Sequence, residues 1–510
     1  MLIRVALMNG GAVSMGSEAR IDRLCNPIRR LAIQGKPQLA LEQLRQLTIR
    51  QDFAAEELWR LYECFYVCYN HLQDWENFRK YIMASINSIP GQSDFIRRSH
   101  YSDYLFTMHY MQDISEADFQ AAHRDYNKLW TNVEGRYHER ERHKRHTKIR
   151  IGYLAENFCA NIISNFSIQL LAAYDRSHFE IYCYSTHPQA DNQSYFIREN
   201  VKGWGEDELR LGSEEKLVQQ IYDDEIDILF DLYGHSSGGL TLLVMGHRPA
   251  PIQISGIGYM ASTGLTCIDY YLSDYYLDPP GLNEQDFSEE LLRLPHSHFC
   301  YTPMERAAFV NRQRCHHDYI MFGSFNKGAK ITDELLQAWA EIMHRVPGSR
   351  LLLRSVMANE YVTKKFKHRL EQVGLDMQRI IIEENAGDYY ERYLDMDIML
   401  DSYPYTGGGT TCDALYMGTP VISRYGKRHG SRFGYSMLAN VGVEELAAPD
   451  WQSYIEKAVA LAKDKQTLYA LQEKLPGMMK SSPIMESKKY VCDMETLYKQ
   501  IFAKWLSIGN

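Results

Sequence analysis

The chain has 510 residues, of which 45% are apolar and 24% are charged. This length and composition predict a globular protein of two or three domains and exclude a disordered or fibrous one. Lys and Arg number 56 against 65 Asp and Glu, for a formal net charge of −9. That balance argues against a protein whose main partner is the phosphate backbone of a nucleic acid.

The cysteines and the apolar runs indicate a compartment. The chain has 10 cysteines, and none forms a C-x-x-C pair, so buried free thiols in a reducing compartment are favoured over disulfides or a zinc site. The N-terminus, MLIRVALMNGGAVSMG, holds an apolar patch too short for a signal sequence, and no window of 18 apolar residues occurs. We therefore expect a cytoplasmic protein that binds neither membranes nor nucleic acids.

Residues 1–140 predict a helical segment. Apolar residues recur there at spacings of three and four, and the helices are separated by breaks at 35–37, 71–74 and 89–91. The run GKPQLAL (35–41) is typical of the start of a tetratricopeptide unit, although the 34-residue period is not kept. We predict a degenerate helical-repeat segment, with a plain helical bundle as the alternative.

A charge-dense joint at 138–148 follows the helical segment. Acidic residues interrupt its basic ones and no aromatic residues are interleaved, so a solvated linker is favoured over a nucleic-acid patch.

Strand–helix alternation begins after this joint, which predicts α/β architecture. We expect a Rossmann-like lobe over 148–310 and a second one over 316–510, facing each other across a cleft. The helices at about 450–506 are expected to pack back across the lobes. The predicted strands of the first lobe are 148–155, 179–186, 226–234, 251–259 and 269–274. Those of the second are 319–325, 350–355, 379–384, 397–404 and the strand that precedes Gly426.

The clearest local motif is a glycine-rich loop between a strand and a helix, TGGGTTCDALYMGTP (406–420). Gly408 and Gly409 let a ligand approach the backbone, the helix start offers free N–H groups to a phosphate, and Thr410 and Thr411 add hydroxyl donors. Asp413 is a candidate helix cap or ribose contact. The loop lacks the G-K-[ST] ending of a Walker loop. The alternative is a tight turn without a ligand.

Three further groups of residues are candidates for the same chemistry. In FGSFNKGAKIT (322–332), Asn326, Lys327 and Lys330 follow a strand, where lysines can neutralise a departing diphosphate. In GKRHGSR (426–432), His429 and Arg432 predict a second anion contact. His235 follows a buried first-lobe strand and is expected to face the cleft. The alternatives are solvated cations for the first two groups and a structural histidine for the third.

Together these residues resemble the O-GlcNAc transferase family of glycosyltransferases, in particular its bacterial members and the plant SPINDLY branch. The resemblance covers about residues 148–505. It is carried by the segments KIRIGYLAENF (148–158), RPAPIQ (248–253), DPPG (278–281), LLRLPHSHFCYTP (291–303), FGSFNKGAKIT (322–332) and LDSYPYTGGGTTCDALYMGTPV (400–421). It implies a two-lobed glycosyltransferase-B fold, a helical-repeat N-terminus, a nucleotide-sugar donor and no metal cofactor. The one D-x-D match, Asp395-Met-Asp397, leads into a buried strand and does not contradict that expectation.

The resemblance also implies roles for single residues. Lys330 resembles the lysine that binds the donor diphosphate and stabilises the leaving group, and Lys327 stands at a polar donor contact. Gly408, Gly409, Thr410 and Thr411 resemble the diphosphate loop. Asp413 resembles the acidic ribose contact, and Arg392 falls where the O-GlcNAc branch has an arginine near the nucleotide.

Three positions depart from the family pattern. Asn161 stands where the family commonly has a histidine facing the reaction centre, and an amide cannot act as a base, though it can orient a hydroxyl. Tyr389 replaces a histidine near the nucleobase, which leaves the donor's identity open. The segment 258–264 replaces a turn richer in proline and glycine.

The predicted function is therefore inverting, metal-independent transfer of a sugar to Ser or Thr hydroxyls of a protein. UDP-GlcNAc is the favoured donor and GDP-fucose the alternative. The candidate catalytic residues are Lys330, His235 and Asn161. The acceptor is a protein, for which flagellin or another surface protein is the suggestion. A sugar-nucleotide epimerase and a catalytically silent nucleotide-binding adaptor are the competing interpretations.

Overall fold

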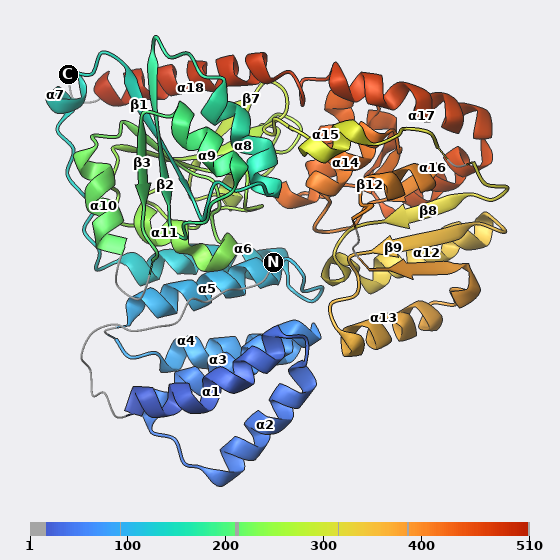
Figure 1. Ribbon diagram of the computed structural model, residues 1–510, viewed down its shortest axis with the longest axis horizontal. Coiled ribbons are helices and arrows are strands. Elements are labelled where there is room, and N and C mark those ends of the chain that lie inside the picture. Colours follow the sequence, from blue (N-terminus) through green and yellow to red (C-terminus); the bar gives the residue numbers. More distant parts are fainter. Residues whose placement is uncertain (1–16, 92, 210–213, 315, 385–386, 508–510) are drawn as a thin grey trace.

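The protein consists of a helical segment and two α/β lobes (Figure 1). The computed structural model describes residues 17–91, 93–209, 214–314, 316–384 and 387–507. The short apolar patch near the N-terminus lies outside these residues. None of the helices within the described ranges is both long and apolar enough to cross a lipid bilayer.

The helical segment is a succession of helices that pack on their neighbours. Its helices are α1 (Ser17–Ile33), α2 (Pro37–Arg50), α3 (Leu58–Leu72), α4 (Trp75–Ser88), α5 (Asp94–Met108) and α6 (Glu116–Tyr126). The three predicted breaks fall between helices, and Pro37 begins α2, where a missing N–H is tolerated. Two further breaks, at 51–57 before α3 and at 109–115 before α6, were not predicted. The helical N-terminal segment is thus confirmed.

The first lobe is built on a seven-stranded parallel sheet in the order β3-β2-β1-β4-β5-β6-β7. Its strands are β1 (Ile149–Ala155), β2 (Phe179–Ser185), β3 (Gly203–Glu206), β4 (Ile228–Asp231), β5 (Ile252–Ser255), β6 (Tyr270–Asp274) and β7 (Glu290–Leu294). Its helices are α8 (Ile162–Ala172), α9 (Asn192–Asn200), α10 (Glu214–Asp223) and α11 (Leu240–Met245).

The prediction omitted the two edge strands, β3 and β7. β3 has the sequence GWGE, which lacks the apolar alternation of a strand. Its glycines have a packing reason, because a Cβ at Gly203 would lie 2.2 Å from the ring of Tyr182 and one at Gly205 would lie 2.6 Å from that of Tyr184.

The second lobe is built on a six-stranded parallel sheet in the order β10-β9-β8-β11-β12-β13. Its strands are β8 (Met321–Ser324), β9 (Arg350–Arg354), β10 (Ile380–Glu383), β11 (Ile398–Leu400), β12 (Val421–Arg424) and β13 (Ala447–Ala448). Its helices are α12 (Asp333–Arg345), α13 (Glu360–Gln372), α14 (Gly409–Met417), α15 (Phe433–Val441), α16 (Trp451–Lys463) and α17 (Lys465–Lys480). Two parallel sheets in an α/β architecture confirm the predicted fold class.

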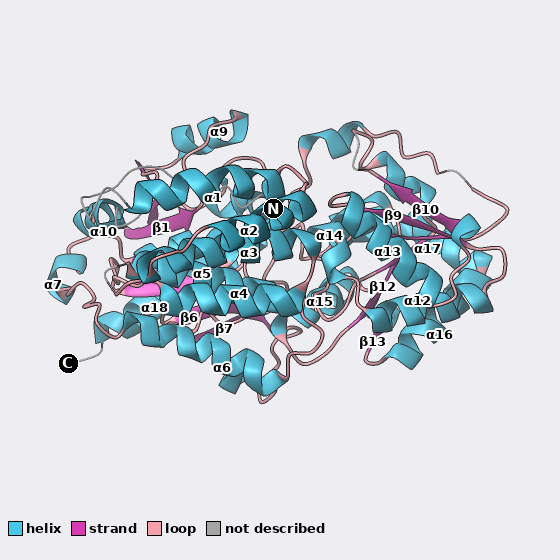
Figure 2. Cartoon of the chain, turned by 90° about the horizontal axis from the view of Figure 1, so that it is seen from below, coloured by secondary structure: helices cyan, strands magenta, loops and turns pink. Residues whose placement is uncertain are grey.

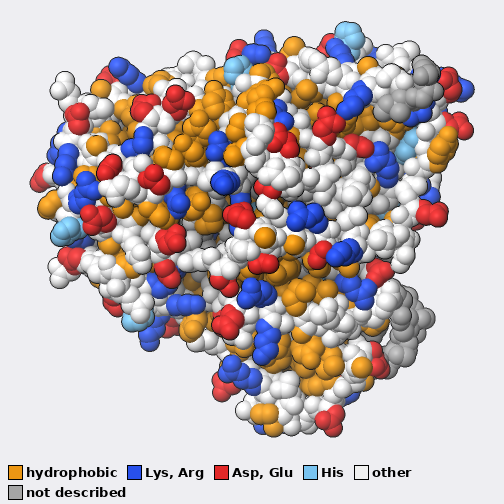
Figure 3. Space-filling view, turned by 180° about the vertical axis from the view of Figure 1, so that it is seen from behind, with side chains coloured by type: hydrophobic (Ala, Val, Ile, Leu, Met, Phe, Trp, Pro, Cys, Tyr) orange, Lys and Arg blue, Asp and Glu red, His pale blue; other side chains and the backbone are white. Residues whose placement is uncertain are grey.

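The last helix, α18 (Ser487–Ser507), returns to the first lobe and lies along it (Figure 1). The Tyr498 hydroxyl lies 3.0 Å from that of Tyr153 on β1, and Glu495 accepts a hydrogen bond of 2.7 Å from the backbone N–H of Asp175. Figure 2, turned by 90°, also places α18 at the first lobe. The prediction that the final helices pack back across the lobes is confirmed. On the face drawn in Figure 3, acidic and basic side chains are interspersed, as the composition suggests.

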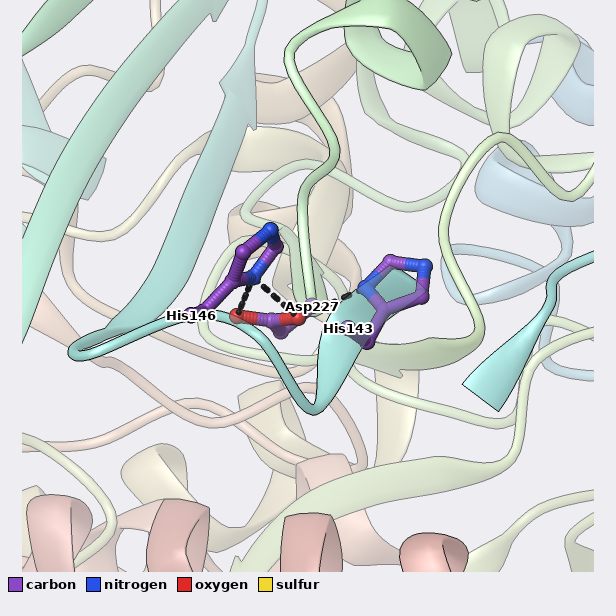
Figure 4. A group of neighbouring side chains, drawn as sticks. All are labelled: His143, His146 and Asp227. Carbon is purple, nitrogen blue, oxygen red and sulfur yellow. Dashed lines mark hydrogen bonds and ion pairs between the residues drawn. The ribbon is translucent and has the colours of Figure 1, made fainter. Parts of the chain in front are cut away.

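The charge-dense joint is fixed to the first lobe by a cluster of buried ionisable groups (Figure 4). Short helix α7 (Arg140–His143) and the turn after it place His143 Nδ1 2.7 Å and His146 Nδ1 3.0 Å from the same oxygen of Asp227. The other nitrogen of His146 lies 2.8 Å from Glu225. Because both nitrogens face carboxylates, hydrogen bonds to Asp227 and Glu225 favour the protonated imidazolium of His146 and raise its pKa.

The composition of this cluster would suit a metal ion, but its geometry is that of hydrogen bonds. Ligands of a tetrahedral zinc ion lie about 2.0–2.1 Å from the metal and therefore about 3.3 Å from one another. The nitrogen–oxygen separations here are 2.7 and 3.0 Å, distances at which a proton lies between the atoms. The joint is thus an ordered link between the helical segment and the first lobe.

The raised pKa of His146 predicts a pH-dependent stability. The imidazolium contributes fully below the unfolded-state pKa of about 6.5, and this contribution is lost as pH rises through the higher folded-state pKa. His146→Gln should therefore lower the free energy of unfolding by about 1–3 kcal/mol at pH 6 and by much less at pH 9.

Chemical denaturation at pH 6, 7.5 and 9 measures this difference. The matched control is His178→Gln, which removes an exposed histidine paired with Asp175. An equal loss at all three pH values for His146→Gln would contradict the protonated state.

Candidate functional site

The candidate site lies where the order of the second sheet reverses. β8 lies between β9 and β11, so the chain leaves β8 toward one side of the sheet and β11 toward the other. In parallel α/β sheets, ligands bind at such switch points, outside the carboxyl ends of the strands. The segment with Asn326 and Lys330 follows β8, and the glycine-rich loop follows β11, so the fold brings the two strongest sequence motifs together.

A buried carboxylate that the sequence analysis missed, Asp401, organises this point. Its Oδ1 accepts hydrogen bonds from the Asn326 amide at 3.1 Å and from the backbone N–H groups of Ser402 and Gly407, both at 2.8 Å. Its Oδ2 accepts from the Ser423 hydroxyl at 2.7 Å. Asp401 thereby joins the ends of β8, β11 and β12 to the start of the glycine-rich loop. An acidic residue at the end of a buried strand, directly before a glycine-rich loop, was the available signal.

The glycine-rich loop ends in an uncapped helix N-terminus. Gly408 is the N-cap residue of α14 and supplies no side-chain cap, so the first-turn N–H groups are open to an anion. The Thr410 hydroxyl donates to the Asn326 side chain at 3.2 Å, whereas the buried Thr411 hydroxyl has no hydrogen-bond partner among the described residues. A Cβ at Gly409 would lie 1.9 Å from the side chain of Ile162. The first lobe therefore touches the second at this loop.

Lys330 points its ammonium group at the same loop. Its Nζ donates to the Thr406 carbonyl at 3.1 Å and lies 3.5 Å from the centre of the Tyr405 ring. Burial, together with the charge of Lys327, lowers the pKa of Lys330 to about 7, although Asp401 raises it. A lysine held beside an open helix N-terminus suits an anionic ligand, whose charge would restore the ammonium form. Lys327 itself is exposed.

Asp413 and Tyr389 also lie together. The buried Asp413 carboxylate accepts hydrogen bonds from the hydroxyls of Tyr301 and Tyr389, the latter at 3.0 Å. Burial raises the pKa of Asp413 to about 6, while the tyrosine hydroxyls lower it. Tyr301 belongs to the connection between the lobes, and its backbone N–H donates to the Ile484 carbonyl at 2.7 Å. The predicted ribose contact thus has two tyrosine partners already in place.

Three of the predicted nucleotide contacts have other partners. Arg392 pairs with Glu383 and Asp395. His429 lies 2.6 Å from a carboxylate oxygen of Asp278, and Arg432 donates to the carbonyls of Tyr276 and Gly426, both at 2.9 Å. Asp278 and Tyr276 follow β6 of the first lobe, so His429 and Arg432 join the two lobes. The Gly430 carbonyl, between His429 and Arg432, accepts from the Thr406 hydroxyl at 2.9 Å, and Thr406 is the residue to which Lys330 donates.

The prediction that His235 faces the cleft is wrong. His235 is fully buried, with its Nδ1 2.9 Å from the Ser102 hydroxyl of α5 and its Nε2 2.9 Å from the Thr263 carbonyl. Burial holds its pKa well below the usual range of histidine. Both nitrogens are engaged, so His235 packs the helical segment against the first lobe.

Asn161 is the N-cap residue of α8. Its Oδ1 accepts from the backbone N–H groups of Ile163 at 2.9 Å and Ser164 at 3.0 Å, and its amide donates to the Tyr233 hydroxyl at 3.2 Å. These bonds explain an asparagine at this position, since Asn is among the preferred N-cap residues. They also leave its amide oxygen committed to the helix.

Two parallel sheets, each with helices on its faces, and a final helix that returns to the first lobe define the glycosyltransferase-B fold. The solved structure of a Thermobaculum terrenum O-GlcNAc transferase variant shares this fold, with a TM-score of 0.74 and 23% identity over 98% of this chain and 100% of that chain. The chain belongs to glycosyl transferase family 41, whose sequence profile matches residues 127–307 and 305–494.

Curated relatives agree with this assignment. The probable UDP-N-acetylglucosamine-peptide N-acetylglucosaminyltransferase SPINDLY of Solanum lycopersicum is 34% identical over 410 residues, which cover 79% of this chain and 44% of the relative. The corresponding SEC protein of Arabidopsis thaliana is 28% identical over 373 residues, covering 70% of this chain and 37% of the relative. The chain thus spans less than half the length of these relatives.

The contacts of Asp401 predict that its oxygens, more than its charge, hold the loop. Asp401→Ala leaves the N–H groups of Ser402 and Gly407 and the Asn326 amide without an acceptor, which should lower the free energy of unfolding by at least about 2 kcal/mol. Asp401→Asn keeps an oxygen for these donors, and the Ser423 hydroxyl can turn to accept from the new amide, so its loss should be smaller. Chemical denaturation of the two variants checks the order, and equal stability of Asp401→Ala and the unaltered protein would contradict it.

Proposed function

We propose that this chain is an inverting glycosyltransferase that moves a sugar from a nucleoside diphosphate sugar to Ser or Thr hydroxyls of a protein. The observation that carries the proposal is the placement of Lys330 beside the uncapped N-terminus of α14, at the switch point of the second sheet. Both features act on negative charge, and both are fixed before any ligand arrives.

The chemistry follows from where charge develops. When the glycosidic bond breaks, the leaving diphosphate gains negative charge. The ammonium of Lys330 and the first-turn N–H groups of α14 would stabilise that charge, with the Thr410 and Thr411 hydroxyls beside them. This is preorganised electrostatic stabilisation by the protein's own groups, so we propose that the reaction needs no metal ion.

The donor and acceptor are proposed from relatives. The names of the SPINDLY and SEC relatives specify UDP-N-acetylglucosamine and a peptide acceptor, which makes UDP-GlcNAc the first donor to test and a protein the acceptor. GDP-fucose is the alternative donor. Neither His235 nor Asn161 is placed to take the acceptor proton, because His235 Nδ1 accepts from the Ser102 hydroxyl and Asn161 Oδ1 accepts from the first N–H groups of α8.

Lys330→Ala should lower transfer by at least about 100-fold, since one missing donor to a developing negative charge typically costs 10²–10³ in rate. The assay follows nucleotide release and protein mass after incubation with UDP-GlcNAc, UDP-glucose, UDP-galactose or GDP-fucose, with EDTA and a lysate acceptor pool present. The control is Lys474→Ala, which removes an exposed lysine on α17. Retention of more than half the activity in Lys330→Ala would contradict its role.

Two other outcomes would change the proposal. Tight nucleotide binding without release from any donor would indicate a catalytically silent adaptor. Activity that disappears with EDTA and returns with a divalent cation would overturn the metal-independent mechanism.

The low pKa of Lys330 predicts that nucleotide binding depends on pH. A bound diphosphate favours the ammonium form and raises this pKa, so binding above pH 7 takes up a proton. The dissociation constant of UDP should therefore rise by up to about tenfold per pH unit between pH 7 and 9. Calorimetry in buffers of different ionisation enthalpy measures both the affinity and the proton uptake. Lys330→Met should bind more weakly and without this dependence, and a flat profile in the unaltered protein would count against a titrating Lys330.

A further inference from the structure

The helical segment reaches the surroundings of Lys330 through aromatic side chains. Tyr110, two residues after α5, lies with its ring centre 5.8 Å from that of Tyr405, and the neighbouring His109 lies 5.7 Å from the same ring. The Tyr405 ring also lies against the Lys330 ammonium at 3.5 Å. One ring of the second lobe therefore contacts both the predicted diphosphate-binding lysine and the helical segment.

Tyr110 is itself held firmly. Its ring stacks on that of Trp75, the first residue of α4, with centres 5.7 Å apart and planes 22° from parallel, and it meets Phe106 edge-on at 5.9 Å. A chain of successive contacts thus runs from the helical segment to the switch point of the second sheet, through Trp75, Tyr110, Tyr405 and Lys330. Ring stacking and cation–π contacts of this kind have preferred geometries, so they fix the position of the rings as well as bury surface.

We propose that Tyr110 is a positioning residue for Lys330, acting through Tyr405, so that the helical segment sets the position and the hydration of the lysine that stabilises the leaving diphosphate. The inference deepens the proposed function and rests on it for its catalytic meaning. Its physical content, the control of one amine by a ring of another domain, stands on the contacts themselves.

The charged and titratable groups around Lys330 come from several elements. Asp401 faces it from the end of β11 and Lys327 from its own turn, while His109 approaches from the helical segment. Burial holds the pKa of His109 well below its usual range, so this ring is neutral at pH 7 and adds no positive charge beside the lysine. Loss of the Tyr110 ring would leave these groups in place and admit water to the space beside Tyr405 that the Tyr110 ring now fills.

The decisive measurement is the titration of the Lys330 amine. The full-length protein is labelled briefly with acetic anhydride between pH 5 and 10, and mass spectrometry of the Lys330 peptide gives the fraction modified at each pH. In Tyr110→Ala the midpoint of labelling should rise by at least one pH unit above that of the unaltered protein, because water replaces the ring. Tyr110→Phe keeps the ring and should keep the midpoint.

The matched control is Tyr137→Ala, which removes a tyrosine that is 77% exposed, and should leave the midpoint unchanged. An unchanged midpoint in Tyr110→Ala, with only a lower melting temperature, would reduce Tyr110 to a packing residue and overturn the inference. The kcat of Tyr110→Ala should fall by about tenfold, since small misplacements of reacting groups cost one to two orders of magnitude.

The titration separates this inference from the proposed function. A shifted midpoint in a protein that releases nucleotide from no donor would support the positioning role and reject the glycosyltransferase proposal. Sugar transfer by the unaltered protein, with an unshifted midpoint in Tyr110→Ala, would do the reverse.

Discussion

The acceptance of four hydrogen bonds by one buried carboxylate underlies the arrangement of the second lobe's functional edge. Asp401 is fully buried, where an unpaired charge is costly, so its oxygens must be matched by donors. The donors it collects come from the ends of β8 and β12 and from both ends of the loop that joins β11 to α14. The glycine-rich loop has its shape because this carboxylate gathers its N–H groups inward. The next N–H groups along the chain, at the start of α14, are then left facing outward.

The same edge shows how much of the site the sequence could predict. Local patterns predicted Lys330, Asn326, Gly409 and Thr410 as site residues because phosphate-binding chemistry uses short motifs at the ends of parallel strands, and the fold brings these residues to one edge of the sheet. Asp401 was missed because its role depends on which strands are neighbours in the sheet. No single segment of the sequence reveals the order of the strands. His235 was misread for a related reason. Its place after a buried strand was predicted, but the helix that covers it, α5, lies more than a hundred residues away in sequence.

Most of the fold could be predicted, except for β3, β7 and β13 at the edges of the two sheets. Interior strands such as β1, β4 and β11 are continuous apolar runs because both faces of a parallel sheet are covered. The edge strand β3 carries tryptophan and glycine because the rings of Tyr182 and Tyr184 fill the space that its side chains would need. Likewise, the cations of the 426–432 segment follow a strand, as Lys330 does, yet Arg432 donates to one carbonyl across the lobe boundary, that of Tyr276. The local sequence pattern predicts only that a cation lies at the edge of the sheet. The packing of the two lobes determines which groups that cation contacts.

The return of α18 to the first lobe has a consequence for motion. The chain crosses between the lobes twice, once between β7 and β8 and once between α17 and α18, and the two crossings are tied together where the Tyr301 N–H meets the Ile484 carbonyl. Two covalent connections side by side permit one lobe to rotate relative to the other about the line through them. They resist twisting or sliding in other directions. Opening for a donor and closing over it would then follow a single path about an axis that passes beside the contact of Ile162 with Gly409, since Tyr301 also donates to Asp413 in the helix that begins at Gly409.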